Sequence, residues 1–206
     1  MATTHERATD EKEAVPATRE GPKRMRWTSA EFYRLGELGF FHNRRVELIA
    51  GEVMVMTINP PHAIAVELLG DTLRAVFGAG YRARMQQPLD LGRWYQPEPD
   101  AAIIAGSPRD YRDAHPTSAL LVVEVSETTL RYDRRVKGHR YAHEGIADYW
   151  IVNLVDRQLE IYRGPGPDPS RRGRSAYADV TIVPATGTAT PLAAPTAVIA
   201  VADLLP

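Results

Sequence analysis

The sequence predicts an α/β (α+β) fold in which a central mixed β-sheet is flanked by helices. Short runs of β-branched residues recur along the chain, other segments have helical periodicity, and Gly- or Pro-rich turns separate them. The 206 residues, 44% hydrophobic and 25% charged, suffice for one globular domain with a sizeable core. Residues 1–24 lack apolar periodicity, so we expect a disordered N-terminal tail there and a single domain over 25–206.

The N-terminal half is predicted to alternate helices and strands. Thr28 and Glu31 have the spacing of a capping box, which favours a helix starting there. Gly51 suits a tight turn between two strands, and Gly78 ends an apolar helical pattern. We expect helices over 28–38 and 63–77, and strands over 45–50, 52–56, 81–91 and 101–105.

The C-terminal half begins with the most apolar run of the chain and then returns to alternating elements. We expect strands over 120–126, 147–153 and 158–163, and a helix over 132–144. Residues 164–175 are rich in Gly, Pro and Arg, which is typical of a flexible loop. Weak strand signals follow from Tyr177 and end at 198–201.

Two carboxylates stand at the ends of predicted strands. Glu124 lies inside an apolar run, where an ionised carboxylate needs a cation, a hydrogen-bond network or a metal. Asp100 ends a Pro-rich turn before the strand at 101–105. Together with the carbonyl of Val125 they could bind Mg²⁺. The alternative is structural: Asp100 caps a turn and Glu124 pairs with an arginine.

A basic segment follows these carboxylates. Lys137 could point to the end of the Glu124 strand and stabilise a phosphodiester transition state, or form a surface pair with Asp133 four residues before it. Arg131, Arg134 and Arg135 could bind a phosphate backbone, or form an ordinary exposed helix face.

Two further residues are candidates from position alone. Glu47 lies in the first predicted hairpin, where a glutamate is usually exposed to solvent. His62 precedes the first long helix and could contact a phosphate or a water, although such a residue often only begins a helix.

Composition excludes several kinds of site. The chain has no cysteine, which excludes disulfides, thiolate zinc sites and cysteine nucleophiles. The net charge of −1 does not itself indicate a nucleic-acid binder, so any DNA contact must come from a local patch. No run is long enough to span a bilayer and no signal-peptide core is present, so we expect a cytoplasmic protein without membrane contact.

Taken in order, the motifs resemble the Uma-type restriction endonuclease family, a bacterial branch of the PD-(D/E)XK nuclease superfamily. The matching segments are 46–52, 59–62, 96–100, 122–126, 133–137 and 145–152. The resemblance implies a restriction-endonuclease-like core with metal ligands at Asp100 and Glu124 and a catalytic Lys137. It also implies a further acidic site residue at Glu47, and His62 matches a recurrent family position.

The chain departs from the superfamily pattern at two positions. Ser126 stands where the superfamily has its lysine, and the family moves that lysine onto the following helix, where Lys137 lies. Glu98 adds a carboxylate beside Asp100, which would increase metal affinity or repel substrate.

The leading hypothesis is a DNA endonuclease that uses Mg²⁺ or Mn²⁺ to hydrolyse phosphodiester bonds. The alternative is a catalytically inactive nucleic-acid-binding or accessory protein on the same fold, and a third hypothesis is a hydrolase of RNA or another phosphodiester. A homodimer is expected because two sites related by a two-fold axis can cut both strands of a duplex.

Overall fold

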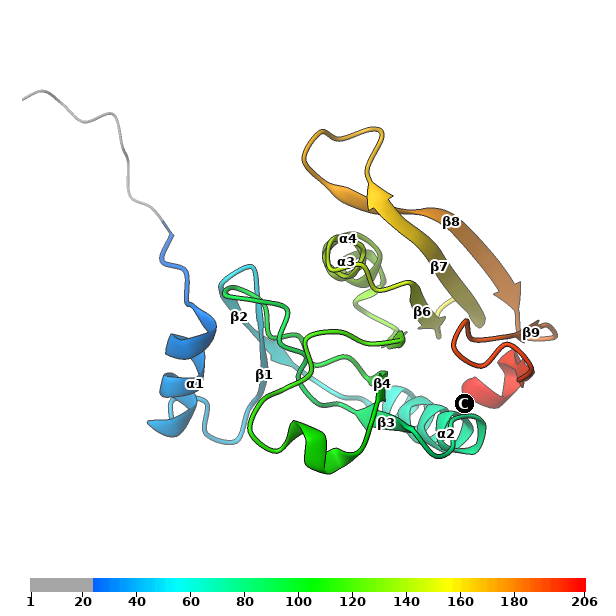
Figure 1. The fold of residues 1–206 in the computed structure, drawn as a ribbon, viewed down its shortest axis with the longest axis horizontal. Coiled ribbons are helices and arrows are strands. Elements are labelled where there is room, and N and C mark those ends of the chain that lie inside the picture. The colour runs from blue at the N-terminus through cyan, green and yellow to red at the C-terminus, as the bar shows by residue number, and fades with distance from the viewer. Residues whose placement is uncertain (1–23) are drawn as a thin grey trace, which may run out of the picture.

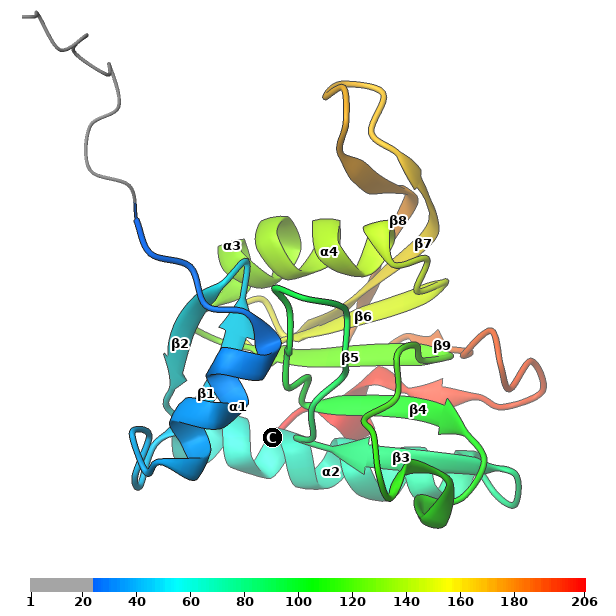
Figure 2. The ribbon, with the colours of Figure 1, turned by 60° about the vertical axis from the view of Figure 1, so that its left-hand side comes forward.

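The computed structural model describes residues 24–206, so the tail predicted over 1–24 lies outside the described residues except for Arg24. Its centre is a six-stranded sheet in the order β3-β4-β5-β6-β7-β8 (Figures 1 and 2). These strands are β3 (Tyr81–Met85), β4 (Ala101–Ala105), β5 (Leu121–Ser126), β6 (Asp148–Asn153), β7 (Gln158–Pro167) and β8 (Ser175–Pro184). Only the β5–β6 pair is parallel, which confirms the predicted mixed sheet.

Helices cover both faces of this sheet (Figure 2). On one face lies α2 (Pro60–Val76), and on the other lies a continuous helical run of α3 (Leu130–Tyr132), a π-helical turn (Asp133–Lys137) and α4 (Gly138–His143). This run is the crossover between the parallel strands β5 and β6. Such a connection is expected, because the chain must return to the end of the sheet at which β5 began before it can form a parallel neighbour.

The remaining elements are short. They are α1 (Ser29–Glu37), β1 (Arg45–Ile49), β2 (Glu52–Met56), β9 (Thr188–Ala189), β10 (Ile199–Ala200) and two 3₁₀ helices, Pro108–Tyr111 and Val201–Leu204. The capping box at the start of α1 is formed as predicted.

Side chains of the central strands alternate between two hydrophobic cores. Val123 of β5 packs with α2 and the C-terminal 3₁₀ helix, whereas Val122 packs with α4. Glu124 has the same parity as Val122, so its side chain points to the face that the helical crossover covers. The predicted buried strand therefore directs its one carboxylate toward the segment that carries Lys137.

The β1–β2 hairpin reaches this region through a main-chain bridge. Leu48 N–H donates to the Gln96 carbonyl at 3.2 Å, and Gln96 N–H returns a bond at 2.8 Å. The bridge joins the hairpin to the segment that leads into β4, and so brings Glu47 and Asp100 to the same region of the fold.

Two element predictions were wrong in extent. The strand predicted over 81–91 ends at Met85, because Gln86 adopts a positive φ of 51° and its N–H donates to the Asp100 carbonyl. Leu89 and Leu91 are buried outside any strand, so their apolar alternation was misleading. The loop predicted over 164–175 is shorter, because β7 and β8 continue as a hairpin up to the pair Pro167–Ser175.

Two predicted helices also begin earlier than expected. The second helix starts at Pro60, where proline fits the first turn, and the Asn59 side chain accepts a bond from His62 N–H. The helix predicted over 132–144 starts at Leu130 and contains the π-helical turn, in which Gly138 N–H donates to the Asp133 carbonyl.

Candidate active site

Lys137 is buried between two carboxylates. Its Nζ lies 3.1 Å from Oε1 of Glu124 and 3.2 Å from Oε2 of Glu47, and the lysine is only 2% exposed. The alternative of a surface pair with Asp133 is therefore wrong, and so is the expectation that Glu47 is exposed. Glu124 pairs with this lysine and not with an arginine. Asp133 is also buried, and its Oδ2 accepts a bond of 2.6 Å from Thr129.

The charges of this cluster shift the pKa values of its members. Burial alone would lower the pKa of Lys137, but the surrounding carboxylates, Glu124 and Glu47 first, raise it well above its usual value. Lys137 is therefore an ammonium ion at neutral pH. Burial raises the pKa of Glu124 to about 8, although Lys137 opposes the rise. Tyr141 donates a hydrogen bond of 2.7 Å to Oε1 of the same carboxylate.

Asp100 lies at the entrance to β4 and is held on three sides. Its Oδ2 accepts a 2.9 Å bond from Val125 N–H and lies 3.2 Å from Nε2 of His62, while Gln86 donates to Oδ1 at 3.1 Å. Burial raises the pKa of Asp100, but the bond and charge of His62, the Val125 N–H and Lys137 outweigh it, so the pKa lies below its usual value. Asp100 is therefore a carboxylate at neutral pH.

A small cavity of about 40 Å³ brings the predicted residues together. Asp100, Glu124, Val125, Lys137 and His62 all line it. Glu47 is not part of this lining, but it pairs with Lys137, which is.

The donor set fits a divalent cation. Among residues 24–206 no three His, Asp or Glu side chains form a ready-made metal cage. Mg²⁺ does not need one, since it binds through one or two carboxylates and keeps several waters. Asp100 is a buried carboxylate, Glu124 is a buried carboxyl group with a raised pKa, and Oε1 of Glu47 is buried without a hydrogen-bond partner. A cation at Asp100, Glu124 and the Val125 carbonyl would favour the ionised form of Glu124.

The three arginines of the basic segment have different surroundings. Arg134 does not face the cavity: its Nε donates to Oε2 of Glu160 at 2.8 Å, and its guanidinium forms a salt bridge with the same carboxylate. Arg131 and Arg135 instead line a larger groove along the outer side of the helical crossover. The prediction grouped the three, but the helix places them in different environments.

Sequence reasoning missed several residues that support the site. Gln86 and Thr129 carried no recognisable signal, because each acts through the fold and not through a motif. Tyr141 did carry one: it follows Lys137 by four residues, the spacing of one helix face. Glu98 is bound to Arg45 at 3.2 Å and does not line the cavity, so its carboxylate is not placed to bind the same cation.

Comparison with known proteins identifies the family and the fold of the chain. Residues 29–202 match the Uma2 family, which is described as "putative restriction endonuclease". The chain belongs to the Uma2 family. This confirms the family-level resemblance and, with the observed sheet and helices, the predicted fold class.

A solved structure has the same fold as this Uma2 chain. It is the crystal structure of a putative nuclease belonging to DUF820 from Anabaena variabilis ATCC 29413, with a TM-score of 0.65 and 14% identity. The match covers 86% of this chain and 96% of that chain. No curated protein matches the chain. Within residues 24–206, no helix has the length and apolar character needed to cross a bilayer.

Proposed function

We propose that this Uma2-family protein is a metal-dependent DNA endonuclease whose site is built from Asp100, Glu124 and Lys137. The observation that carries the proposal is the position of Lys137. Although it comes from the helical crossover, its Nζ lies 3.1 Å from the strand carboxylate Glu124, in the cavity that Asp100 also lines. A lysine beside carboxylates that can hold a divalent cation is suited to phosphodiester hydrolysis, and here the helical crossover supplies this lysine.

Each residue has a role in this proposal. Asp100, Glu124 and the Val125 carbonyl would hold Mg²⁺ or Mn²⁺, which when bound offsets charge on the scissile phosphate and lowers the pKa of a water. Lys137, as an ammonium ion, orients that water and stabilises the developing negative charge. Glu47 is a positioning residue for Lys137, and His62 is one for Asp100.

Cleavage of plasmid and linear DNA with Mg²⁺, Mn²⁺ or EDTA tests the proposal. The parent protein is expected to cut with either metal and to stop in EDTA, and Asp100→Asn is expected to abolish cutting. Asp71→Asn is the matched control, because Asp71 is an exposed aspartate on α2, outside the cavity. Equal cutting by parent and Asp100→Asn would rule out this site, and a parallel RNA substrate separates deoxyribonuclease from ribonuclease activity.

One observation favours a non-catalytic nucleic-acid-binding protein as the second candidate. Lys137 already pairs with Glu124, and the cavity is small at about 40 Å³, so the carboxylate could serve only to anchor the crossover. This candidate predicts salt-sensitive DNA binding without cutting in any metal, and cutting that depends on Asp100 would eliminate it.

We also propose that the protein works as a homodimer in the cytoplasm. Two sites related by a two-fold axis can reach both strands of a duplex, and DNA is the substrate proposed. Light scattering is expected to give twice the chain mass of 22.9 kDa without DNA, and the same protein mass plus the mass of the duplex when duplex DNA is bound. A monomer mass in both conditions would contradict the dimer.

A further inference from the structure

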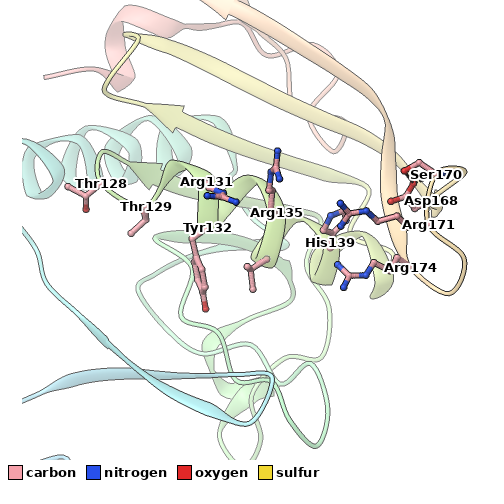
Figure 3. A pocket seen from close by; sticks show the side chains of 11 residues that line it. Thr128, Thr129, Arg131, Tyr132, Arg135, His139, Asp168, Ser170, Arg171 and Arg174 are labelled. Atoms are coloured by element: carbon pink, nitrogen blue, oxygen red, sulfur yellow. Dashed lines mark hydrogen bonds between the residues drawn. The ribbon is translucent and has the colours of Figure 1, made fainter.

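A basic groove of about 680 Å³ lies beside the candidate active site. One wall is the outer side of the helical crossover, and the other is the loop that joins β7 to β8 (Figure 3). Figure 3 shows Arg171 and Arg174 reaching from this loop toward His139, with Arg131 and Arg135 farther along the helix. We name this cavity the hairpin groove. It is lined by Thr128, Thr129, Arg131, Tyr132, Arg135, Val136, His139, Asp168, Ser170, Arg171 and Arg174.

The hairpin groove has a strong excess of positive charge although the whole chain has a net charge of −1. Its lining contains four arginines and one aspartate. The aspartate, Asp168, turns back to its own loop, where its Oδ1 accepts bonds of 2.8 and 2.6 Å from the N–H and hydroxyl of Ser170. No carboxylate of residues 24–206 lies within salt-bridge distance of the four arginines. As far as the described part of the chain is concerned, these guanidinium groups are therefore available to an anionic ligand.

The two walls of the groove are joined to each other and to the cavity. Nδ1 of His139 lies 2.7 Å from the Ser175 carbonyl, which fixes the start of β8 against α4. At the other end, Thr128 and Thr129 line both the groove and the small cavity that contains Asp100 and Glu124. A polyanion bound in the groove would therefore run directly to the candidate site.

We propose that the hairpin groove binds the sugar-phosphate backbone of a single nucleic-acid strand and guides it to the cavity. The inference rests on the proposed function, which it deepens by naming the form of the substrate. The volume of the groove is that of a pocket for a small ligand, roughly 300–1,000 Å³, and suits a few nucleotides of one strand but not a duplex. The candidate catalytic residues are also recessed, since Asp100 is 6% and Glu124 3% exposed, and a flexible single strand can bend into such a site.

The lining also indicates how the strand is recognised. Figure 3 shows Tyr132 pointing away from the hairpin loop, and its hydroxyl is buried, so the ring is not a stacking platform in the groove. The arginines can bind the phosphates of a strand whatever its base sequence. Binding is therefore expected to depend strongly on salt and weakly on base sequence.

Fluorescence anisotropy in EDTA, where no cutting is expected, tests this inference. The probes are labelled oligothymidylate of about 20 nucleotides, longer than one strand-binding module covers, and duplex DNA and oligouridylate of the same length. Four phosphate contacts predict a slope of log affinity against log salt of about −2.8 for the single strand. Arg171→Ala/Arg174→Ala is expected to bring the slope to about −1.4 and to weaken binding roughly tenfold at about 0.1 M salt.

The matched control is Arg109→Ala/Arg112→Ala, which removes two exposed arginines outside the groove. It is expected to bind the single strand like the parent. Equal affinities for the control and the groove variant would overturn the inference, as would tighter binding of the duplex than of the single strand by the parent. If the parent binds oligouridylate and oligothymidylate with equal affinity, the groove inference stands and its ligand includes single-stranded RNA.

The experiments can reject the groove inference and the nuclease proposal independently of each other. If the parent cuts DNA in an Asp100-dependent manner while the groove variant binds and cuts like the parent, the groove inference is wrong and the nuclease proposal stands. If the parent cuts nothing but binds the strand through Arg171 and Arg174, the nuclease proposal is wrong and the groove inference stands.

Discussion

Lys137 is the residue on which the candidate site depends most. A lysine that is 2% exposed is expensive to bury, and here Glu47 and Glu124 compensate its charge from two different strands. The same contacts hold the ammonium group at the cavity. Stability and proposed catalysis therefore use the same atoms, and they have to be separated by experiment.

Lys137→Met is expected to lose both stability and DNA cleavage. Removing the ammonium leaves the buried carboxyl groups of Glu47 and Glu124 without their cationic partner, which lowers the free energy of unfolding by about 3–5 kcal/mol. DNA cleavage is expected to fall by roughly 10²–10³, the usual cost of removing one transition-state stabilising group. Urea unfolding and plasmid cleavage measure the two effects.

A second variant separates these effects. Glu47→Gln/Lys137→Met removes one carboxylate together with the lysine, and so is expected to recover part of the unfolding free energy without recovering cleavage. If cleavage returns together with stability, Lys137 is structural and has no part in the chemistry.

The sequence indicated which residues lie together at the candidate site better than it indicated their surroundings. Glu124 was predicted to be buried because its whole neighbourhood is apolar, and it is. Glu47 lies in a strand whose alternation did not decide which face is covered, and the partner that buries it, Lys137, is 90 positions away in the sequence. Contacts of this kind are set by the packing of the hairpin on the sheet, which local patterns do not contain.

The helical crossover between β5 and β6 is the element that assembles the site. Its π-helical turn, Asp133–Lys137, holds both Asp133 and Lys137 on the buried side, and such turns are often found at functional sites. The Asp133 carbonyl accepts bonds from Gly138 N–H and, at 3.1 Å, from the Tyr149 hydroxyl of β6, so the turn is fixed to the sheet. A regular helical repeat could not predict this change in geometry.

Neighbouring arginines of the crossover are expected to behave differently. Arg134 is bound to the buried carboxylate of Glu160, so Arg134→Ala is expected to lower the unfolding free energy by about 1–3 kcal/mol. Arg135 lines the hairpin groove, so Arg135→Ala is expected to leave stability within about 0.5 kcal/mol and to weaken single-strand binding. Urea unfolding and anisotropy on both variants check this, and the reverse pattern would contradict the assignment.

The same ion pair predicts a pH dependence of stability. Burial raises the pKa of Glu160, but hydrogen bonds from Arg134, Tyr162 and Asn153 outweigh it, so the folded pKa lies below the usual value. Glu160 therefore stabilises the fold above its unfolded pKa of about 4.3, and this contribution is lost as the pH falls through the lower folded value.

Glu160→Gln is the variant that tests this dependence. In urea unfolding the parent is expected to be more stable than the variant at about pH 7, and the difference is expected to shrink toward about pH 3. A difference that stays constant over this range would show that the carboxylate contributes no charge-dependent stability.

At the scale of the whole molecule, the order of elements was predictable and their ends were not. The mixed sheet followed from apolar runs separated by helical segments, and it is present. The β7–β8 hairpin extends into a segment rich in Gly and Pro, which local composition assigned to a loop. Because pairing with β8 supplies the hydrogen bonds of β7, the strand continues where its own sequence would not predict it.

The two hydrophobic cores lie on opposite faces of one sheet, and we propose that they unfold together as a single domain. Leu204 is fully buried in the core beneath α2, and Ile146 is fully buried in the core beneath α4. Leu204→Ala and Ile146→Ala are each expected to cost about 2–5 kcal/mol. In calorimetry each is expected to move one transition by roughly 2–4 °C per kcal/mol, with equal calorimetric and van't Hoff enthalpies. If calorimetry instead shows two transitions and each variant moves only one of them, the two cores unfold as separate units. The strands that both cores share would then not couple their unfolding.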